Sequence, residues 1–188
     1  MNTFETIKAR KSVRAFEDKP VEKEKIEKIA NAGNMAAGTP MAGKVYFNVI
    51  SNKELLKGIA EATKAVMQKS GVDMLVKLSA NPMFNPLYNA PVAIVVSTDI
   101  ADNPNSASMA TQNAACAAEN MLLAATDLGL GSCYLMTPTM AFAVPAMKEA
   151  TGLKENTQPV CVVVVGYTND TAPHREYQFN PDNIIYVM

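Results

Sequence analysis

Hydrophobic residues recur along this chain at two kinds of spacing, which predict helices in some stretches and strands in others. Between residues 21 and 35, Ile26, Ile29 and Gly33 recur at helical spacing with charged residues between them, which predicts an amphipathic helix. Apolar runs rich in β-branched residues predict strands over 45–50, 90–97 and 159–167, with a shorter strand over 133–136. The runs at 90–97 and 159–167 lack polar alternation, so we expect both faces of their sheet to be covered.

Polar residues mark where two of the helices begin. Asn2-x-x-Glu5 and Ser51-x-x-Glu54 have the spacing of capping boxes, in which the first side chain bonds a backbone amide of the first turn. They predict one helix that fades near residue 11 and another that ends near residue 68.

The longest helical pattern, over about 107–128, is almost without charge. Glu119 and Asp127 are its only charged residues, and a helix that is apolar on every side lies centrally or in an interface. A shorter helix over about 141–151 ends at Gly152. This order of helices and strands predicts a single layered domain of α+β or α/β class over residues 1–188.

Three stretches depart from regular periodicity. Residues 36–43 form a small, uncharged loop, which is either an ordinary connector or a place where a ligand approaches the backbone closely. Residues 70–89 hold two Asn-Pro pairs and predict a partly helical excursion that is mobile, closes over a cleft or faces a partner. Residues 168–188 form a tail whose apolar segment 184–187 predicts a final strand, buried by exchange with a second chain.

Composition narrows the function classes. A net charge of -1 and a pI of about 5.9 argue against a nucleic-acid-binding protein that works by bulk charge. No apolar run reaches the roughly 20 residues that a membrane span needs, and residues 1–5 lack a signal-peptide core. Cys116, Cys133 and Cys161 predict buried thiols in a reducing compartment, the cytoplasm. With His174 as the only histidine and no Cys-x-x-Cys, we expect neither a metal site nor a Cys/His catalytic pair.

Three cations and a hydroxyl group lie within residues 10–14. In an extended segment, Arg10, Ser12 and Arg14 share one face, with Lys11 and Val13 on the other. Two guanidinium groups beside a hydroxyl group suit an anion such as phosphate, because guanidinium matches phosphate geometry bidentately. Alternatively, the segment is a solvated basic cluster at the end of a helix, where cations are favoured.

Two other functional classes have weak support. A hydrolase would need Ser12 or Ser132 beside His174, but the chain has no Gly-x-Ser-x-Gly elbow, and Ser132 is expected to follow a helix rather than a strand. The chain also has no P-loop and no Gly-x-Gly-x-x-Gly after a strand, which argues against classical dinucleotide binding.

Three motifs stand out by their order along the chain. Residues 10–16 read Arg-Lys-Ser-Val-Arg-Ala-Phe, and residues 120–134 join Asn-Met-Leu-Leu-Ala-Ala to Leu-Gly-Leu-Gly-Ser-Cys-Tyr. Gly152-Leu153 then precedes the strand that ends in Val-Gly-Tyr at 165–167. In this order they resemble the nitroreductase family of FMN-dependent oxidoreductases, whose members show Arg-x-Ser-x-Arg/Lys-x-Phe, Gly-Leu-Gly-Ser-Cys and Val-Gly-Tyr motifs. The resemblance covers nearly the whole chain.

This resemblance implies a fold and an activity. The fold is α+β, with three α-β-α layers around a mixed, mainly antiparallel sheet, in an intertwined homodimer that holds FMN in clefts between the subunits. NAD(P)H would supply electrons, and an oxidised small molecule such as a nitroaromatic or a quinone would accept them. The cofactor carries the chemistry, so no catalytic side chain is predicted. The alternative is a flavin-binding protein with little turnover, which stores or senses flavin.

The resemblance also assigns residues to the cofactor. It places Arg10 and Ser12 on the FMN phosphate and ribityl chain, with Lys11 contributing mainly its backbone. Arg14 matches a cation at the flavin N1 and O2 edge, where reduction places negative charge. The other implied contacts are Asn85 at the pyrimidine ring, Met136 and Thr137 near N5, and Arg175 at the phosphate, with His174 sharing that role.

Two segments depart from the family pattern. Residues 37–43 replace the family loop Pro-Ser-x-x-Asn-x-Gln-Pro and lack its polar side chains at Met41 and Gly43, which predicts fewer hydrogen bonds to flavin or substrate. In the tail, His174-Arg175-Glu176 stands where the family often has two cations.

Overall fold

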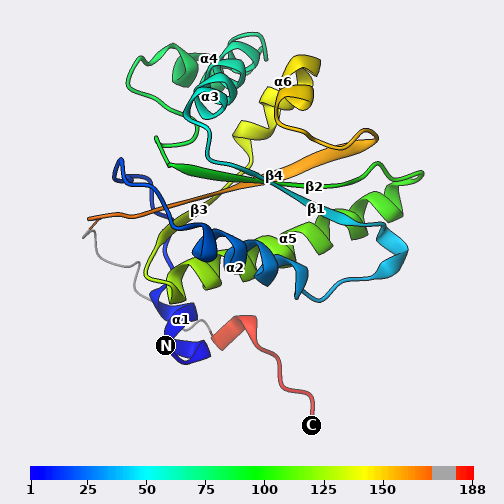
Figure 1. Cartoon of the computed structure of the whole chain (residues 1–188). Helices are drawn as coiled ribbons and strands as arrows, with labels where there is room; N and C mark the ends of the chain where they lie inside the picture. The colour runs from blue at the N-terminus through cyan, green and yellow to red at the C-terminus, as the bar shows by residue number, and fades with distance from the viewer. Residues whose placement is uncertain (171–180) are drawn as a thin grey trace.

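A four-stranded sheet in the order β1-β2-β4-β3 lies at the centre of the molecule (Figure 1). The computed structural model describes residues 1–170 and 181–188. The strands are β1 Val45–Ile50, β2 Val92–Asp99, β3 Gly131–Leu135 and β4 Thr157–Gly166. The four strands predicted from the apolar runs before the tail are therefore confirmed, within a few residues of the predicted bounds.

Helices cover both faces of this sheet (Figure 1). On one face lie α2 (Lys23–Asn34) and α5 (Pro104–Asp127), and on the other lie α3 (Lys53–Gln68), α6 (Pro145–Ala150) and the 3-10 helix η2 (Thr137–Ala143). The shorter helices are α1 (Thr3–Ala9), α4 (Asp73–Ala80), η1 (Pro40–Ala42) and η3 (Pro181–Asn183). The α+β fold with three α-β-α layers is confirmed, and α4 confirms the partly helical excursion within 70–89.

The strand pairings are less mixed than the resemblance implied. β1 with β2, β2 with β4 and β3 with β4 are all antiparallel. The one parallel pairing found within residues 1–170 and 181–188 is an isolated bridge between Ser12 and Ser132. Parallel pairing is therefore limited to the place where the segment after α1 meets the start of β3.

The unbroken apolar run of β4 supplies two hydrophobic cores. Val162 and Val164 belong to the core under α3, whereas Cys161, Val163 and Val165 belong to the core under α5. Alternate side chains point to opposite faces of a strand, so a strand covered on both faces favours apolar side chains in both directions. This confirms the expectation that both faces of the sheet are covered.

Helix α5 is buried along one face and exposed along the other. Its buried side chains, which pack against the sheet and α2, are Ala110, Ala114, Ala117, Ala118, Met121, Leu122 and Ala125. A Cβ atom on Gly33 would clash with Met121 and Phe47, which explains why the hydrophobic row of α2 includes a glycine. Cys116 is exposed, so the prediction that all three cysteines are buried is wrong for this one, because it points away from the sheet.

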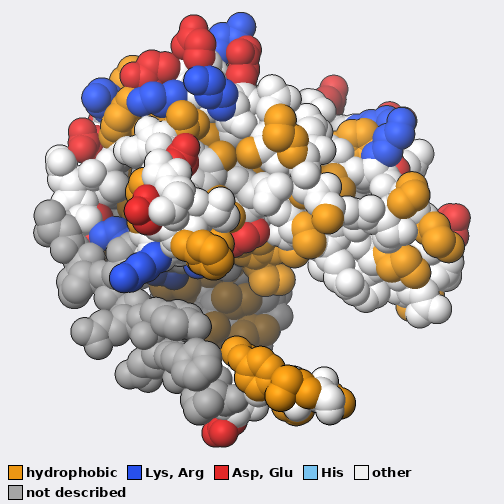
Figure 2. Space-filling model, turned by 90° about the horizontal axis from the view of Figure 1, so that it is seen from below, with side chains coloured by type: hydrophobic (Ala, Val, Ile, Leu, Met, Phe, Trp, Pro, Cys, Tyr) orange, Lys and Arg blue, Asp and Glu red, His pale blue; other side chains and the backbone are white. Residues whose placement is uncertain are grey.

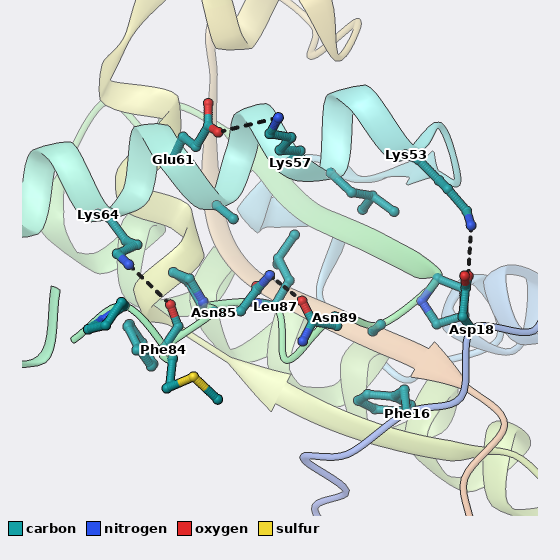
Figure 3. A pocket seen from close by; sticks show the side chains of 17 residues that line it. Phe16, Asp18, Lys53, Lys57, Glu61, Lys64, Phe84, Asn85, Leu87 and Asn89 are labelled. Carbon is teal, nitrogen blue, oxygen red and sulfur yellow. Dashed lines mark hydrogen bonds and ion pairs between the residues drawn. The ribbon is translucent and has the colours of Figure 1, made fainter. Parts of the chain in front are cut away.

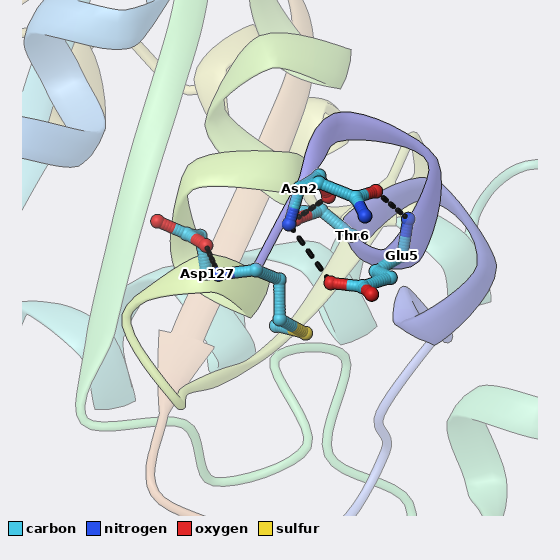
Figure 4. A network of polar contacts seen from close by, with 5 residues as sticks. Asn2, Glu5, Thr6 and Asp127 are labelled. Atoms are coloured by element: carbon cyan, nitrogen blue, oxygen red, sulfur yellow. Dashed lines mark hydrogen bonds and ion pairs between the residues drawn. The ribbon is translucent and has the colours of Figure 1, made fainter.

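The predicted helix starts are partly confirmed. Asn2 and Glu5 form the predicted capping box on α1, with Asn2 Oδ1 accepting from the Glu5 amide at 3.0 Å (Figure 4). The box predicted at Ser51 is wrong. The cap of α3 is Asn52, whose Oδ1 accepts from the amides of Glu54 and Leu55 at 2.9 and 3.1 Å. An asparagine and a serine are both good caps, and only the backbone conformation decides which one holds the position.

The last two differences concern the segment after β3 and the tail. Residues 137–143 form η2 rather than a short turn, so α6 begins later than predicted, at Pro145. The strand predicted over 184–187 is not formed, and those side chains are exposed, since no neighbouring strand offers them a partner within the single chain. Among the described helices, none combines the length and hydropathy needed to cross a membrane.

Replacing Asn52 tests whether this residue, and not Ser51, caps helix α3. Asn52→Ala is expected to lower the free energy of unfolding by about 1 kcal/mol, because two amides of the first turn lose their acceptor. Ser51→Ala, the matched control, is expected to change it by less than about 0.5 kcal/mol, in the range of ordinary surface substitutions. Urea unfolding of both variants measures the difference. A larger loss of unfolding free energy in Ser51→Ala than in Asn52→Ala would show that Ser51 is the cap, as the sequence predicted.

Candidate functional site

The basic segment at residues 10–14 runs in extended form across the start of β3. The amide of Val13 donates to the carbonyl oxygen of Ser132 at 2.9 Å, and the Val13 side chain is only 2% exposed. Ser12 and Arg14, on either side of Val13, are exposed. The predicted alternation is therefore confirmed, because the burial of Val13 forces its neighbours to point outward.

The three cations of this segment have different partners. Arg10 Nε lies 3.1 Å from Glu119 Oε1 on α5. Lys11 Nζ donates to the Asp170 carbonyl oxygen at 2.7 Å and lies 3.4 Å from its carboxylate. Arg14 takes part in no ion pair found among the described residues. Its guanidinium is therefore the cation of this segment whose charge is not offset by a neighbouring carboxylate.

Arg14 is held by two weaker contacts. Its Nη1 donates to the Ser12 carbonyl oxygen at 3.4 Å. Its guanidinium carbon lies 5.9 Å from the centroid of the Tyr88 ring. These contacts orient the guanidinium without neutralising it. They also connect the basic segment to the turn that contains Asn85.

Asn85 closes a turn between α4 and β2 (Figure 3). Its Oδ1 accepts from the Leu87 amide at 2.8 Å, and its Nδ2 donates to Asn89 Oδ1 at 2.7 Å. An asparagine amide has two hydrogens to donate, and one of them is used in this turn. Asn85 also lines a cavity of about 690 Å³ between this turn and α3.

Met136 and Thr137 lie at the opposite end of β3 from Ser12. Met136 directly follows the strand and is 67% exposed, and Thr137 begins η2. Met136 lies four positions after Ser132. At about 3.3 Å per residue, this corresponds to roughly 13 Å along the strand. β3 thus places the basic segment at one end and the Met136–Thr137 backbone at the other, along one edge of the sheet.

Cys133, between these two ends, is a neighbour that the sequence did not reveal as part of the site. It is buried, and burial raises the pKa of its thiol, while the nearby Arg14 guanidinium and the Ser12 hydroxyl act in the opposite direction. Its sequence surroundings are apolar, so nothing in the pattern marked it as close to two exposed polar residues. The cysteine contributes packing beneath the segment as an un-ionised thiol.

Two further residues were missed by the sequence reasoning. Glu119 faces Arg10, and its presence as one of two charges on a helix otherwise without charge was the available signal. Tyr88 faces Arg14, and no sequence pattern marked it. Arg175 and His174 lie outside the described residues. Ser132 is only 1% exposed, which removes it as a hydrolase nucleophile.

The loop over residues 36–44 is tied to the rest of the chain at both ends. The Thr39 amide donates to Asn113 Oδ1 at 3.0 Å, and Asn113 Nδ2 donates back to the Thr39 carbonyl oxygen at 2.9 Å. The Lys44 amide donates to Asp99 Oδ2 at 2.8 Å. Met41, between these ties, is 79% exposed. The loop is therefore ordered by its own chain and presents an exposed methionine between its two ties.

Neither of two large cavities in the described part of the chain holds the predicted site residues as a group. Of the predicted set, only Asn85 lines the cavity of about 690 Å³. A second cavity, of about 780 Å³, lies between α2 and the ends of β1 and β2 and contains none of them. Of the predicted residues near β3, Ser12, Arg14 and Met136 are exposed, whereas Arg10, Lys11 and Thr137 are partly buried. No cluster of His, Cys, Asp or Glu that could hold a metal ion is found in the part of the chain that the structure describes.

Comparisons with known proteins identify the family and the fold of this chain. The model of the Nitroreductase family matches residues 7–167, which include the basic segment and β3. A protein of Archaeoglobus fulgidus, named provisionally as an NADH dehydrogenase/NAD(P)H nitroreductase, is 32% identical over 95% of this chain and 93% of its own. Among solved structures, a Bacteroides fragilis nitroreductase with bound FMN has a TM-score of 0.89 and 29% identity, with 100% of each chain covered. A Desulfitobacterium hafniense nitroreductase with bound FMN has a TM-score of 0.84 and 26% identity, again over 100% of each chain.

The ion pair between Arg10 and Glu119 gives a prediction about anion binding. If Arg10 holds a phosphate, the Glu119 carboxylate competes for the same guanidinium. Glu119→Gln is therefore expected to lower the Kd for FMN by up to about fivefold, since an exposed ion pair contributes about 0.2–1 kcal/mol. Fluorescence titration of FMN into the apoprotein measures this.

Glu27→Gln is the matched control, because Glu27 forms an ion pair with Lys23 on α2, away from the basic segment. Its Kd for FMN is expected to stay at the wild-type value. Weaker binding by Glu119→Gln than by the control would show that Glu119 supports the site instead of competing with the ligand.

Proposed function

Because this chain belongs to the nitroreductase family, we propose that it is an FMN-dependent oxidoreductase that takes electrons from NAD(P)H and passes them to an oxidised small molecule. A nitroaromatic or a quinone is the class of acceptor that the family suggests. The observation that carries the proposal is the match over residues 7–167, which spans every predicted site residue except Arg175. The relatives named as reductases or solved with FMN support it further.

The order of the residues near β3 supports an FMN site, with cations and a hydroxyl group at the start of the strand and backbone groups at its end. Arg10 and Ser12, with the backbone of Lys11, would hold the phosphate and ribityl chain at the start of the strand. Arg14 forms no ion pair among residues 1–170 and 181–188, and its charge suits an edge of the flavin ring that becomes negative on reduction. The remaining assigned contacts are Asn85 at the pyrimidine ring, Met136 and Thr137 near N5, and Arg175 at the phosphate.

FMN, when bound, supplies the two-electron chemistry, accepting hydride equivalents from the donor and passing them to the acceptor. The chain itself binds and orients the ring and adjusts its electron affinity through charge. Arg14 favours the reduced state of the ring, because a fixed cation stabilises the negative charge that forms there. No side chain is required to act as a general acid, and none is assigned.

A second copy of this chain completes the proposed site. Ser12, Arg14 and Met136 are exposed in the single chain, and the outward face of α5 carries small, exposed residues such as Ala115 and Cys116. The C-terminal segment is apolar and exposed, with Ile185 at 85% and Val187 at 93%, and it projects from the body of the molecule (Figure 2). An intertwined homodimer would bury these surfaces and close the clefts. We place the dimer in the cytoplasm, since the three cysteines are free thiols.

The alternative, a flavin-binding protein that stores or senses flavin with little turnover, is not favoured. It was motivated by the loop at residues 37–43, which lacks polar groups. That loop is well tied to Asn113 and Asp99, so its composition does not leave a disordered gap in the site. The relatives named for reductase activity also argue for turnover.

An absorbance spectrum of the purified protein, before and after anaerobic addition of NADH or NADPH, tests the proposal. A flavin spectrum that bleaches with either donor and returns with a quinone is the expected result. A protein that stays colourless after incubation with FMN would refute the proposal. A yellow protein that neither donor bleaches would support flavin storage or sensing instead.

Substitution of the two arginines separates binding from electron affinity. Arg10→Ala is expected to raise the Kd for FMN by at least tenfold, because a charge-assisted hydrogen bond contributes roughly 1.5–3 kcal/mol. Arg14→Ala is expected to lower the flavin reduction potential with a smaller effect on Kd. FMN titration and potentiometry measure the two quantities.

Lys8→Ala is the matched control, because Lys8 is an exposed cation in the last turn of α1 and is absent from the predicted site. It is expected to change neither Kd nor potential. Equal effects of the two arginine substitutions on both quantities would contradict the division of roles.

A further inference from the structure

The turn before β2 places two consecutive residues in the left-handed region of the backbone map. Tyr88 has φ 53° and Asn89 has φ 57°, and neither is a glycine. Residues with side chains adopt this region infrequently, and a bulky aromatic residue there is unusual. Such outliers persist only where the surrounding structure determines them, and they cluster at sites that act on ligands.

The surroundings of this turn do determine it. The Tyr88 amide donates to the Asn85 carbonyl oxygen at 2.9 Å, and the Ala90 amide donates to the Leu87 carbonyl oxygen at 3.0 Å. The side-chain bonds of Asn85 to Leu87 and Asn89 close the same loop. Leu87 is 2% exposed and belongs to the core under α3. The turn is thus anchored on both sides of Tyr88.

The turn separates two environments. Asn85, Leu87 and Asn89 line the cavity of about 690 Å³ beside α3, where their side chains are seen together (Figure 3). Tyr88 does not line that cavity, and its ring faces Arg14 instead. The left-handed backbone conformation is what turns this one side chain toward the basic segment.

The Tyr88 ring holds Arg14 in a way that a carboxylate would not. The distance of 5.9 Å from guanidinium to ring centroid is within the range of a cation–π contact. Arg10 and Lys11, by contrast, face the carboxylates of Glu119 and Asp170. A carboxylate offsets the positive charge of its partner, whereas an aromatic ring orients a cation and leaves its net charge available to a third group.

We propose that Tyr88 is a positioning residue that holds Arg14 over the turn. The guanidinium, which forms no ion pair among the described residues, then faces the ring edge of the bound flavin that becomes negative on reduction. This rests on the proposed function, since it assigns Arg14 to that edge. Tyr88 acts through Arg14 and through its aromatic face, so its hydroxyl group is dispensable. Tyr88→Phe therefore preserves the effect, and Tyr88→Leu, which keeps an apolar side chain, removes it.

The first experiment uses the protein without flavin. The Tyr88 ring current shifts the NMR signals of the Arg14 side chain, and this shift is expected in the wild type and in Tyr88→Phe and absent in Tyr88→Leu. Urea unfolding of each variant confirms that it is folded. A folded Tyr88→Leu variant in which the Arg14 signals are unchanged would overturn the proposal, whatever the protein does with FMN.

The second experiment measures the two-electron reduction potential and the Kd of FMN in the wild type, Tyr88→Leu, Arg14→Ala and the double variant. Tyr88→Leu is expected to lose about tenfold in preference for reduced over oxidised flavin, which corresponds to about 30 mV for a two-electron couple. In the Arg14→Ala background the same substitution is expected to have no further effect, because the cation it positions is gone. Tyr88→Phe, measured in the same way, is expected to keep the wild-type potential.

The outcomes distinguish a failure of the proposed function from a failure of the role of Tyr88. A wild type that binds no FMN refutes the proposed function, and with it this role of Tyr88. A wild type that binds FMN, with an unchanged potential in Tyr88→Leu, refutes only the role of Tyr88. Equal shifts from Tyr88→Leu in the presence and absence of Arg14 would show that the ring acts on the flavin directly.

Discussion

The hydrogen bond from the Val13 amide to the Ser132 carbonyl oxygen, together with the burial of Val13, is the constraint on which the candidate site depends. It fixes the residues after α1 as an extended segment against the start of β3. Because alternate side chains of such a segment point in opposite directions, one buried valine places Ser12 and Arg14 outward. A shift of one residue would bury the hydroxyl group and the guanidinium and expose the valine, at a large cost in desolvation.

The cations of this segment illustrate how tertiary partners give similar residues different roles. Arg10 meets a glutamate from α5, Lys11 meets an aspartate after β4, and Arg14 meets an aromatic ring from the turn before β2. A phosphate bound at Arg10 would compete with this carboxylate, whereas Arg14 forms no ion pair among the described residues. Two arginines within five residues thus have different surroundings, which is the basis for the different roles proposed for them.

The sheet explains why these groups are spread along a line and left open. β3 is the last strand in the order of the sheet, paired with β4 on one side and joined at its start to the segment after α1 by the Ser12–Ser132 bridge. Its length separates the basic segment from the Met136–Thr137 backbone. Among the described residues, no named strand lies beyond this edge of the sheet to cover a ligand. The exposed face of α5 and the exposed apolar tail are consistent with a second copy providing that cover, since both carry the kind of surface that association buries.

The sequence alone determined the strands, most of the helices, the alternation at residues 10–14 and the family resemblance, because each is encoded in local spacing or in a contiguous motif. The cap of α3 at Asn52 rather than Ser51, and the missing strand at 184–187, required three dimensions: a cap depends on backbone conformation and a strand on a neighbour. The pairing of Glu119 with Arg10, and of Tyr88 with Arg14, also came only from the tertiary structure. These residues are distant in sequence and follow no period, and only the packing of α5 and of the turn before β2 around the end of β3 brings them together.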